Sequence, residues 1–483
     1  MTHPTNSLPP EILACIFTQA SCRCDSYLDY DDIPSPILNP ISCSAVCKHW
    51  RQVAVSHQSL WTHIDLVVNV IDKDGKYYSP EVWLERSRGA PLSVQVLQPR
   101  FPLNDEYLEQ EEEESMTIAL PDPDQVPAPM VNRLVNFLTP LMPQVRSLTT
   151  FLSYPYESTL KLLLDCWKTY GTPGQAKALK TLSNMELAHI TIRSPKAYTS
   201  FLESLEVLHL HNTVLKSWSS FLFPNLIEFK TSVGEGEWSI ALPKLAGILS
   251  SCPKLQRLSL NGLRVKPFPT SRPKPILLQD LRELRISGYG DTHETDRAAT
   301  TLEYVLDMII PGQDALDLEL ALPGISKSPQ RAINAVTGFE DNPYFASQLG
   351  PLPRVQTLIL EEFCFCDVVR VESRLLNFED DGLNLDEYNN PRPINPELVL
   401  WPDVRNLCLC QCVLEEEHLC HLVSLHSVQA LYMQGCLNNI PATSDSAAEP
   451  DTSFESRQSM KHYIQPLLQF VPKVVPDAAW DIC

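Results

Sequence analysis

One short pattern recurs through the chain from about residue 140 onward and restricts the folds that the chain can adopt. An apolar residue and a proline are followed by apolar residues two and five positions after the proline. The pattern occurs at residues 142–148, 223–229, 252–258, 352–358 and 401–407, and without proline at 202–208, 278–284 and 425–431. Most copies have one more apolar residue two positions later. Because this spacing alternates at its end, and because proline favours an extended approach, each copy predicts a short half-buried strand.

The copies read L-x-x-L-x-L and resemble the strand segment of a leucine-rich repeat. Their spacing of about 21 to 29 residues, where they are consecutive, matches one such repeat. Two longer intervals contain weaker copies at 179–182 and 315–320, while 241–249 and 301–310 have helical spacing. The expected fold class is therefore α/β. Over residues 66–437 we predict an irregular leucine-rich-repeat solenoid, with short parallel strands on the concave face and helices and loops on the convex face.

Ahead of the repeats lie two segments with the apolar spacing of amphipathic helices. Residues 8–17 read LPPEILACIF and residues 46–54 read VCKHWRQVA, while 59–64 read SLWTHI. Proline suits the first turn of a helix, and the apolar residues of 8–17 form one wide stripe. A helical unit of about 60 residues cannot bury all of this surface by itself, so part of it should face a partner.

These three pieces, in this order, resemble an F-box. The resemblance implies a three-helix domain over residues 1–65 that docks on the Skp adaptor and so joins a cullin–RING ubiquitin ligase core of the SCF type. The residues that match the motif, and that the resemblance assigns to adaptor binding, are Leu8, Pro9, Ile12, Leu13, Ile16, Val46, Trp50 and Trp61. Residues 20–42 are longer than the usual link between the first two helices. Their acidic residues and prolines indicate an insertion, which resembles those of fungal F-box proteins.

Charge and composition exclude several classes of partner. The formal net charge is −21 and the pI is near 5.0, so we expect neither a nucleic acid nor an anionic membrane surface as partner. No apolar run reaches the ~18 residues of a membrane span, and no secretory signal is visible. We therefore predict a cytoplasmic or nuclear protein with reduced cysteines. Acidic loops are predicted near 101–129 and 377–390, and 438–483 reads as a flexible Ser-rich, acidic tail with a terminal capping helix.

The outward positions of the predicted strands supply the candidate target-binding residues. They include Arg257, Arg282, Arg285 and Arg405, together with His209, Ser259 and Cys408. Arginine forks suit carboxylate and phosphate groups, so the expected target is a protein that is acidic or phosphorylated.

The sequence offers little for catalysis. It contains no phosphate-binding loop and none of the common hydrolase or metalloprotease motifs. The sharpest chemical cluster is formed by Cys408, Cys410 and Cys412 with His418, Cys420 and His421, but its spacing does not match a common zinc site. We predict no catalytic residues, no metal site and no cofactor, and a non-catalytic substrate-recognition adaptor. Two alternatives stay open: a repeat scaffold outside any ligase, and a metal- or thiol-dependent enzyme using residues 408–421.

Overall fold

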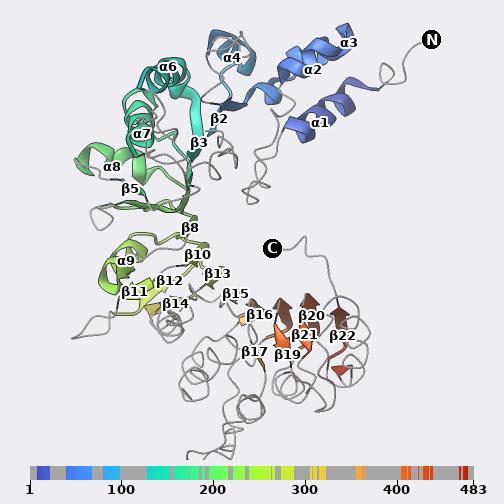
Figure 1. The fold of residues 1–483 in the computed structure, drawn as a ribbon, viewed down its shortest axis with the longest axis vertical. Coiled ribbons are helices and arrows are strands. Elements are labelled where there is room, and N and C mark those ends of the chain that lie inside the picture. The colour runs from blue at the N-terminus through green and yellow to red at the C-terminus, as the bar shows by residue number, and fades with distance from the viewer. Residues whose placement is uncertain are drawn as a thin grey trace, which may run out of the picture. The chain divides into compact units, whose positions relative to one another are not determined.

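The structure is a computed structural model of the whole chain, and Figure 1 shows its fold. It describes residues 8–21, 40–67, 80–97, 128–152, 157–172, 174–183, 188–190, 195–215, 221–233, 239–262, 264–266, 274–287, 305–306, 308–312, 315–321, 355–361, 364–365, 404–410, 412–414, 423, 428–434, 436–438, 467–468 and 471–476. The chain divides into two compact units, Met1–Gly236 (unit 1) and Glu237–Cys483 (unit 2). The predicted boundaries at 65 and 437 stay predictions.

Unit 1 begins with short helices that share one apolar core. They are α1 (Pro10–Ser21), α2 (Pro40–Val46), α3 (Lys48–Ser56) and the 3-10 helix η2 (Gln58–Trp61). Cys47 caps α3, because its sulfur accepts a hydrogen bond of 3.4 Å from the backbone N–H of Trp50. The core of these helices is formed by Leu13, Phe17, Val53 and Trp61. The three helices predicted from residues 8–64 are therefore present.

A parallel sheet follows in the same unit. Its strands, in spatial order, are β1 (His63–Val67), β2 (Leu92–Leu97), β3 (Val145–Leu152), β4 (Ala178–Ser183), β6 (Val207–His211) and β8 (Glu228–Ser232). Two shorter strands, β5 (Ala188–Ile190) and β7 (Thr213–Leu215), pair beside it. Parallel strands need crossover connections, and helices supply most of them here.

The connecting helices of unit 1 are α4 (Pro80–Ser87), α6 (Ala128–Leu138), η3 (Met142–Gln144), α7 (Glu157–Tyr170) and α8 (Pro195–Glu203). Figure 1 shows α6, α7 and α8 one after another along one side of the strands. Trp167 on α7 is buried, and its indole N–H donates a hydrogen bond of 3.1 Å to the carbonyl oxygen of Val145 on β3. The helices are thus packed on the sheet by aromatic side chains as well as by aliphatic ones.

Unit 2 contains a parallel sheet of the same kind. Its described strands, in spatial order, are β10 (Arg257–Asn261), β13 (Glu283–Ser287), β15 (Leu316–Ala321), β16 (Val355–Glu361), β18 (Asn406–Cys410), β20 (Ala430–Gln434) and β22 (Lys473–Pro476). Helix α9 (Leu242–Ser250) packs against short strands (Figure 1). The strands that α9 contacts are β9 (Ser239–Ala241), which pairs with β11 (Arg264–Lys266), and β12 (Ile276–Leu278), which pairs with β14 (Ile309–Pro311). Separately, β17 (Cys364–Phe365), β19 (Val413–Leu414) and β21 (Leu437–Asn438) form a row.

The strands stay in register from one to the next, so side chains form rows across each sheet. In unit 2 one inward row contains Leu258, Leu284, Leu318, Leu358, Leu407 and Leu431, and the next contains Leu260, Ile286, Leu320, Leu360, Leu409 and Met433. All of these side chains are buried. Because strand side chains alternate, the residues between them lie in outward rows. The regularly spaced apolar residues of the sequence pattern are therefore the residues of these two inward rows.

The strands predicted at the repeated pattern are present, including the weaker copies, which form β4 and β15. The helix predicted over 301–310 is wrong at its end. Ile309 and Ile310 belong to β14 and pair in parallel with β12; β-branched residues favour strands when a partner edge is available. Strand β22 lies in the predicted tail and was not predicted.

The predicted acidic loops and most of the 20–42 insertion lie outside the described residues, as does most of the terminal capping helix. Among the helices that the structure describes, none has both the length and the apolar character needed to span a bilayer.

Candidate functional site

Helix α1 has one buried side and one exposed apolar side. Leu13 and Phe17 face the core, whereas Ile12 is 49% exposed and Ile16 is 46% exposed. Val46, at the end of α2, is 60% exposed, and Pro9 is exposed at the start of α1. We call Pro9, Ile12, Ile16 and Val46 the apolar helix surface. Large apolar side chains with this exposure are usual at interaction sites, because they stay in contact with water until a partner covers them.

Four predicted adaptor-binding residues are not part of the apolar helix surface. Leu8 and Trp50 are half-buried, and the Trp50 ring packs on Phe17 with 4.9 Å between ring centroids. Leu13 is 1% exposed and Trp61 is 0% exposed. The prediction placed Leu13 and Trp61 in the contact surface, whereas the structure places them in the core. Adaptor contact by the eight residues stays a prediction.

Trp61 is buried because unit 1 encloses it on several sides. Its indole N–H donates to the carbonyl oxygen of Ala54 at 2.8 Å. Trp83 meets it edge to face at 5.2 Å, and the Arg86 guanidinium lies 4.2 Å from the centroid of its ring. Such a cation–π contact adds to the apolar packing. The side chain of Gln58 also donates to the carbonyl oxygen of Ser87 at 2.6 Å. Helix α4 therefore packs directly on η2.

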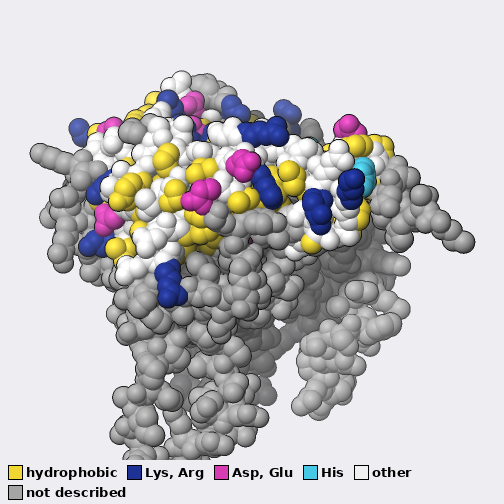
Figure 2. Space-filling view, turned by 90° about the horizontal axis from the view of Figure 1, so that it is seen from above, with side chains coloured by type: hydrophobic (Ala, Val, Ile, Leu, Met, Phe, Trp, Pro, Cys, Tyr) yellow, Lys and Arg dark blue, Asp and Glu magenta, His cyan; other side chains and the backbone are white. Residues whose placement is uncertain are grey.

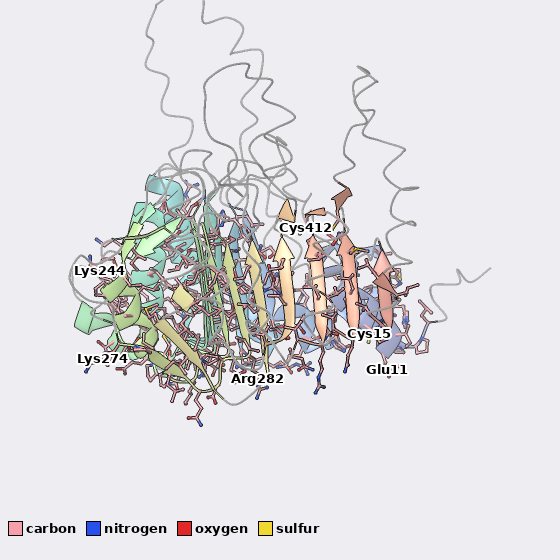
Figure 3. All side chains as sticks on the ribbon, turned by 90° about the horizontal axis from the view of Figure 1, so that it is seen from below. Glu11, Cys15, Lys244, Lys274, Arg282 and Cys412 are labelled. Carbon is pink, nitrogen blue, oxygen red and sulfur yellow. The ribbon has the colours of Figure 1, made fainter. Side chains whose placement is uncertain are left out.

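A carboxylate and a thiol lie on α1 beside the apolar helix surface. Glu11 and Cys15 are exposed on α1, and Figure 3 shows both on this helix. Figure 2 shows hydrophobic side chains interspersed with Lys, Arg, Asp and Glu on the described part of the face that it views.

The predicted target-binding arginines lie along the sheet of unit 2. Arg257, Arg282 and Arg405 are exposed, and Figure 3 shows Arg282 near the N-terminal ends of the strands. Arg285 is half-buried, and its Nε lies 2.5 Å from Glu283 and 3.2 Å from Glu319. One carboxylate of its own strand, Glu283, and one of the neighbouring strand β15, Glu319, therefore already neutralise Arg285. Target binding by the four arginines stays a prediction.

Two residues that were expected to face outward into solvent are buried. Ser259 is 5% exposed and Cys408 is 1% exposed. Their small side chains lie in outward rows between larger neighbours: the register places Cys408 between Ile359 and Tyr432. Strand alternation fixes the direction of a side chain, but the size of the flanking side chains decides whether water reaches it.

A charged group on the sheet of unit 1 was only partly predicted. The register places Lys180 beside His209 and His209 beside Lys230, on β4, β6 and β8. His209 Nε2 lies 2.7 Å from Glu228, and Lys230 Nζ lies 3.0 Å from the same carboxylate oxygen. Only His209 was named among the outward residues from the sequence. Comparing the central positions of 178–183, 207–211 and 228–232 would have found the two lysines.

The local environment changes the acid–base properties of this group. Burial lowers the pKa of His209 below its usual value; the Glu228 carboxylate opposes this shift and the charges of Lys180 and Lys230 add to it. Burial also lowers the pKa of His211 to about 4. Both histidines are consequently neutral at pH 7, and the charge of the group comes from lysines and carboxylates.

Within the 408–421 cluster, the described Cys412 forms hydrogen bonds with backbone carbonyl oxygens. Cys412 is buried, and its thiol contacts the carbonyl oxygens of Leu360 at 3.3 Å and Cys410 at 3.4 Å as donor. Cys436 repeats these contacts one strand later. In Figure 3 Cys412 lies beside the C-terminal ends of the strands. His418, Cys420 and His421 lie outside the described residues. In the part that is described, no three His, Cys, Asp or Glu residues are grouped as metal ligands would be.

Comparison with known proteins gives one family and no curated relative. The F-box-like family model matches residues 5–67. A search of curated proteins finds no match. The matched residues contain α1, α2, α3, η2 and β1, the elements that carry the apolar helix surface. Residues 5–67 are thus an F-box-like domain, as the first helices predicted.

Proposed function

We propose that the chain is a substrate-recognition adaptor of an SCF-type ubiquitin ligase. In this proposal the F-box-like domain docks on the Skp adaptor, and the parallel sheets hold a target protein. The observation that carries the proposal is the apolar helix surface, which exposes Ile12, Ile16 and Val46 within a domain of the F-box-like family. F-box domains typically bind Skp adaptors, and the chain would act without bond-making chemistry of its own.

We also propose that the region after the F-box-like domain is an irregular leucine-rich-repeat solenoid. Two features support this proposal. Leucine-rich inward rows continue across successive parallel strands, and Cys412 and Cys436 take equivalent positions just after β18 and β20, where their thiols serve backbone carbonyls. Repeats of this kind stack because one repeat alone cannot bury its apolar face. A stack of strands offers a target a long row of outward side chains.

The apolar helix surface is tested by changing exposed residues only. Ile12→Glu/Ile16→Glu places charges where an apolar partner surface would desolvate them, without touching the buried Leu13 and Phe17. We expect binding of purified Skp adaptor to fall by about thirtyfold or more, the effect of losing about 2 kcal/mol at an interface centre. Isothermal titration or surface plasmon resonance measures the dissociation constant.

The matched control is Leu162→Glu on α7, since Leu162 is 44% exposed and outside the F-box-like domain. This variant should bind the adaptor like the wild type. Circular dichroism of all proteins separates lost binding from lost folding. If the wild type itself does not bind the adaptor, the ligase proposal is wrong, and a repeat scaffold that serves another partner becomes the better explanation.

A further inference from the structure

The sheet of unit 1 presents a line of basic side chains on neighbouring strands. Lys180, His209 and Lys230 occupy the same central register position on β4, β6 and β8. Neighbouring strands lie about 4.8 Å apart, so the two lysines stand about 10 Å from each other across the strands. We call these three residues with Glu228 the central group.

Glu228 neutralises only one cation of the central group. Its side chain is buried and accepts from both His209, at 2.7 Å, and Lys230, at 3.0 Å. Lys180 has no ion pair with any residue that the structure describes, and its side chain is half-buried. The positive charge of a lysine that lies beside a histidine and has no carboxylate partner is not compensated, so it can bind an anion.

A second basic line lies at the start of the same strands. Lys177 Nζ is 2.9 Å from Glu206, and Arg146 is 3.8 Å from the same carboxylate group. The backbone N–H of Lys177 donates to the carbonyl oxygen of Arg146, and that of Glu206 to Lys177, so the three residues follow one another across β3, β4 and β6. Here one carboxylate serves two cations.

Together the two lines carry four basic and two acidic side chains, with His209 neutral. They form an excess of positive charge in a chain whose net charge is −21. The cations are distributed along the sheet rather than gathered around one point. A compact phosphate group needs convergent donors, whereas a line of separate cations matches anionic groups spaced along an extended peptide.

We propose that the outward face of β3, β4, β6 and β8 binds an extended Asp- and Glu-rich segment of a partner protein, with Lys180 and Lys230 as its principal contacts. The proposal rests on the proposed function, since it gives the class of target that the adaptor would hold. Charge complementarity is its physical basis, so the affinity should fall with salt.

The test uses the full chain in complex with Skp adaptor and three fluorescent peptides of equal length: one rich in Asp and Glu, one with Asn and Gln in their place, and one with phosphoserine. Fluorescence anisotropy at low salt should show binding of the Asp/Glu peptide and no binding of the amide peptide. Lys180→Glu/Lys230→Glu should weaken binding of the acidic peptide by about tenfold or more. Lys244→Glu/Lys274→Glu, the same charge change at two exposed lysines of unit 2, should alter it less than twofold.

Each outcome decides the proposal. Equal loss in both double variants, or absence of acidic-peptide binding in the wild type, would overturn it. Binding of the phosphoserine peptide more than tenfold tighter than the Asp/Glu peptide would overturn the assignment to carboxylates. Failure of the proposed function is recognised separately, because Ile12→Glu/Ile16→Glu should lose the adaptor yet keep the peptide. If the wild type retains adaptor but binds no acidic peptide, only the present inference fails.

Discussion

The two sheets use the same ladder of parallel strands to present different side chains outward. In unit 1 the central outward row contains Thr149, Lys180, His209 and Lys230. In unit 2 it starts with Ser259, Arg285 and Glu319 and continues with Ile359, Cys408 and Tyr432. The basic side chains of unit 1 exceed their carboxylate partners, whereas Arg285 is matched by Glu283 and Glu319. A continuous backbone pattern therefore does not imply one continuous binding chemistry.

The inward rows differ as well. The last inward row of unit 1 includes the buried Thr150, Thr181 and Thr231, where the described strands of unit 2 have apolar residues from Leu260 to Met433. Threonine fits the pleat of a strand but brings a hydroxyl that needs a hydrogen-bond partner. One inward row of unit 1 is thus more polar than the matching row of unit 2. We expect substitutions in the two rows to change the free energy of unfolding by different amounts.

The largest effect is expected from the inward row of unit 2. Leu320→Ala removes a side chain that is 0% exposed and should lower the free energy of unfolding by about 3 kcal/mol, through lost burial and the cavity left behind. Thr181→Ala at the matching row of unit 1 should cost about 1 kcal/mol. Urea denaturation measures both. Equal losses would mean that the two rows are energetically alike.

Acid should affect unit 1 before unit 2. The pKa of His211 is about 4 in the folded chain because of burial, against an ordinary value of 6.5. Between these values the unfolded chain takes up a proton that the folded chain does not, so stability falls as pH decreases from about 6.5 to about 4. Hydrogen exchange should show β6 and β8 losing protection first, since no histidine lies in the outward rows of the described strands of unit 2.

His211→Gln should reduce this acid sensitivity, whereas His57→Gln, at an exposed histidine, should leave it unchanged. If both variants behave like the wild type, the acid response has another origin.

A smaller gain is expected from Thr231. Its hydroxyl is buried and has no hydrogen-bond partner among the described residues. Thr231→Val keeps the side-chain shape and removes the unpaired hydroxyl, so the free energy of unfolding should rise by about 1 kcal/mol. Thr181→Val serves as the control, because the Thr181 hydroxyl donates to the carbonyl oxygen of His209 at 3.5 Å. Thermal melts that show the same change in both variants would contradict this reasoning.

The smallest effect concerns the charges of the central group. Lys180→Gln removes a cation that lowers the pKa of His209, so this pKa should rise; Glu228→Gln removes the carboxylate that raises it, so it should fall. Titration of the His209 ring by NMR measures both shifts. Shifts in the same direction would show that Lys180 and Glu228 do not act on His209 as the distances indicate.

Much of this organisation could be predicted from the sequence. The spacing at 252–258 or 401–407 marks inward positions, because alternation and burial act within one strand. Exposure in the outward rows could not be predicted in this way, because it depends on neighbours that are distant in sequence. Cys408 illustrates the difference: Ile359 and Tyr432 flank it through register alone. Trp61 illustrates it in the helices, since Trp83 and Arg86 enclose it from a segment that the motif does not include.

The contact between η2 and α4 limits how this chain can be divided or recombined. The carbonyl oxygen of Thr62, between η2 and β1, accepts a hydrogen bond from the backbone N–H of Ser93 on β2. The residue that links the helices to β1 therefore also takes part in the pairing of β1 with β2. A deletion ending at residue 65 would remove the cover of Trp83 and the partner edge of β2. The helices are therefore not an independent unit: we expect a transfer of them onto another protein to require β1, α4 and β2 as well for the helices to remain folded.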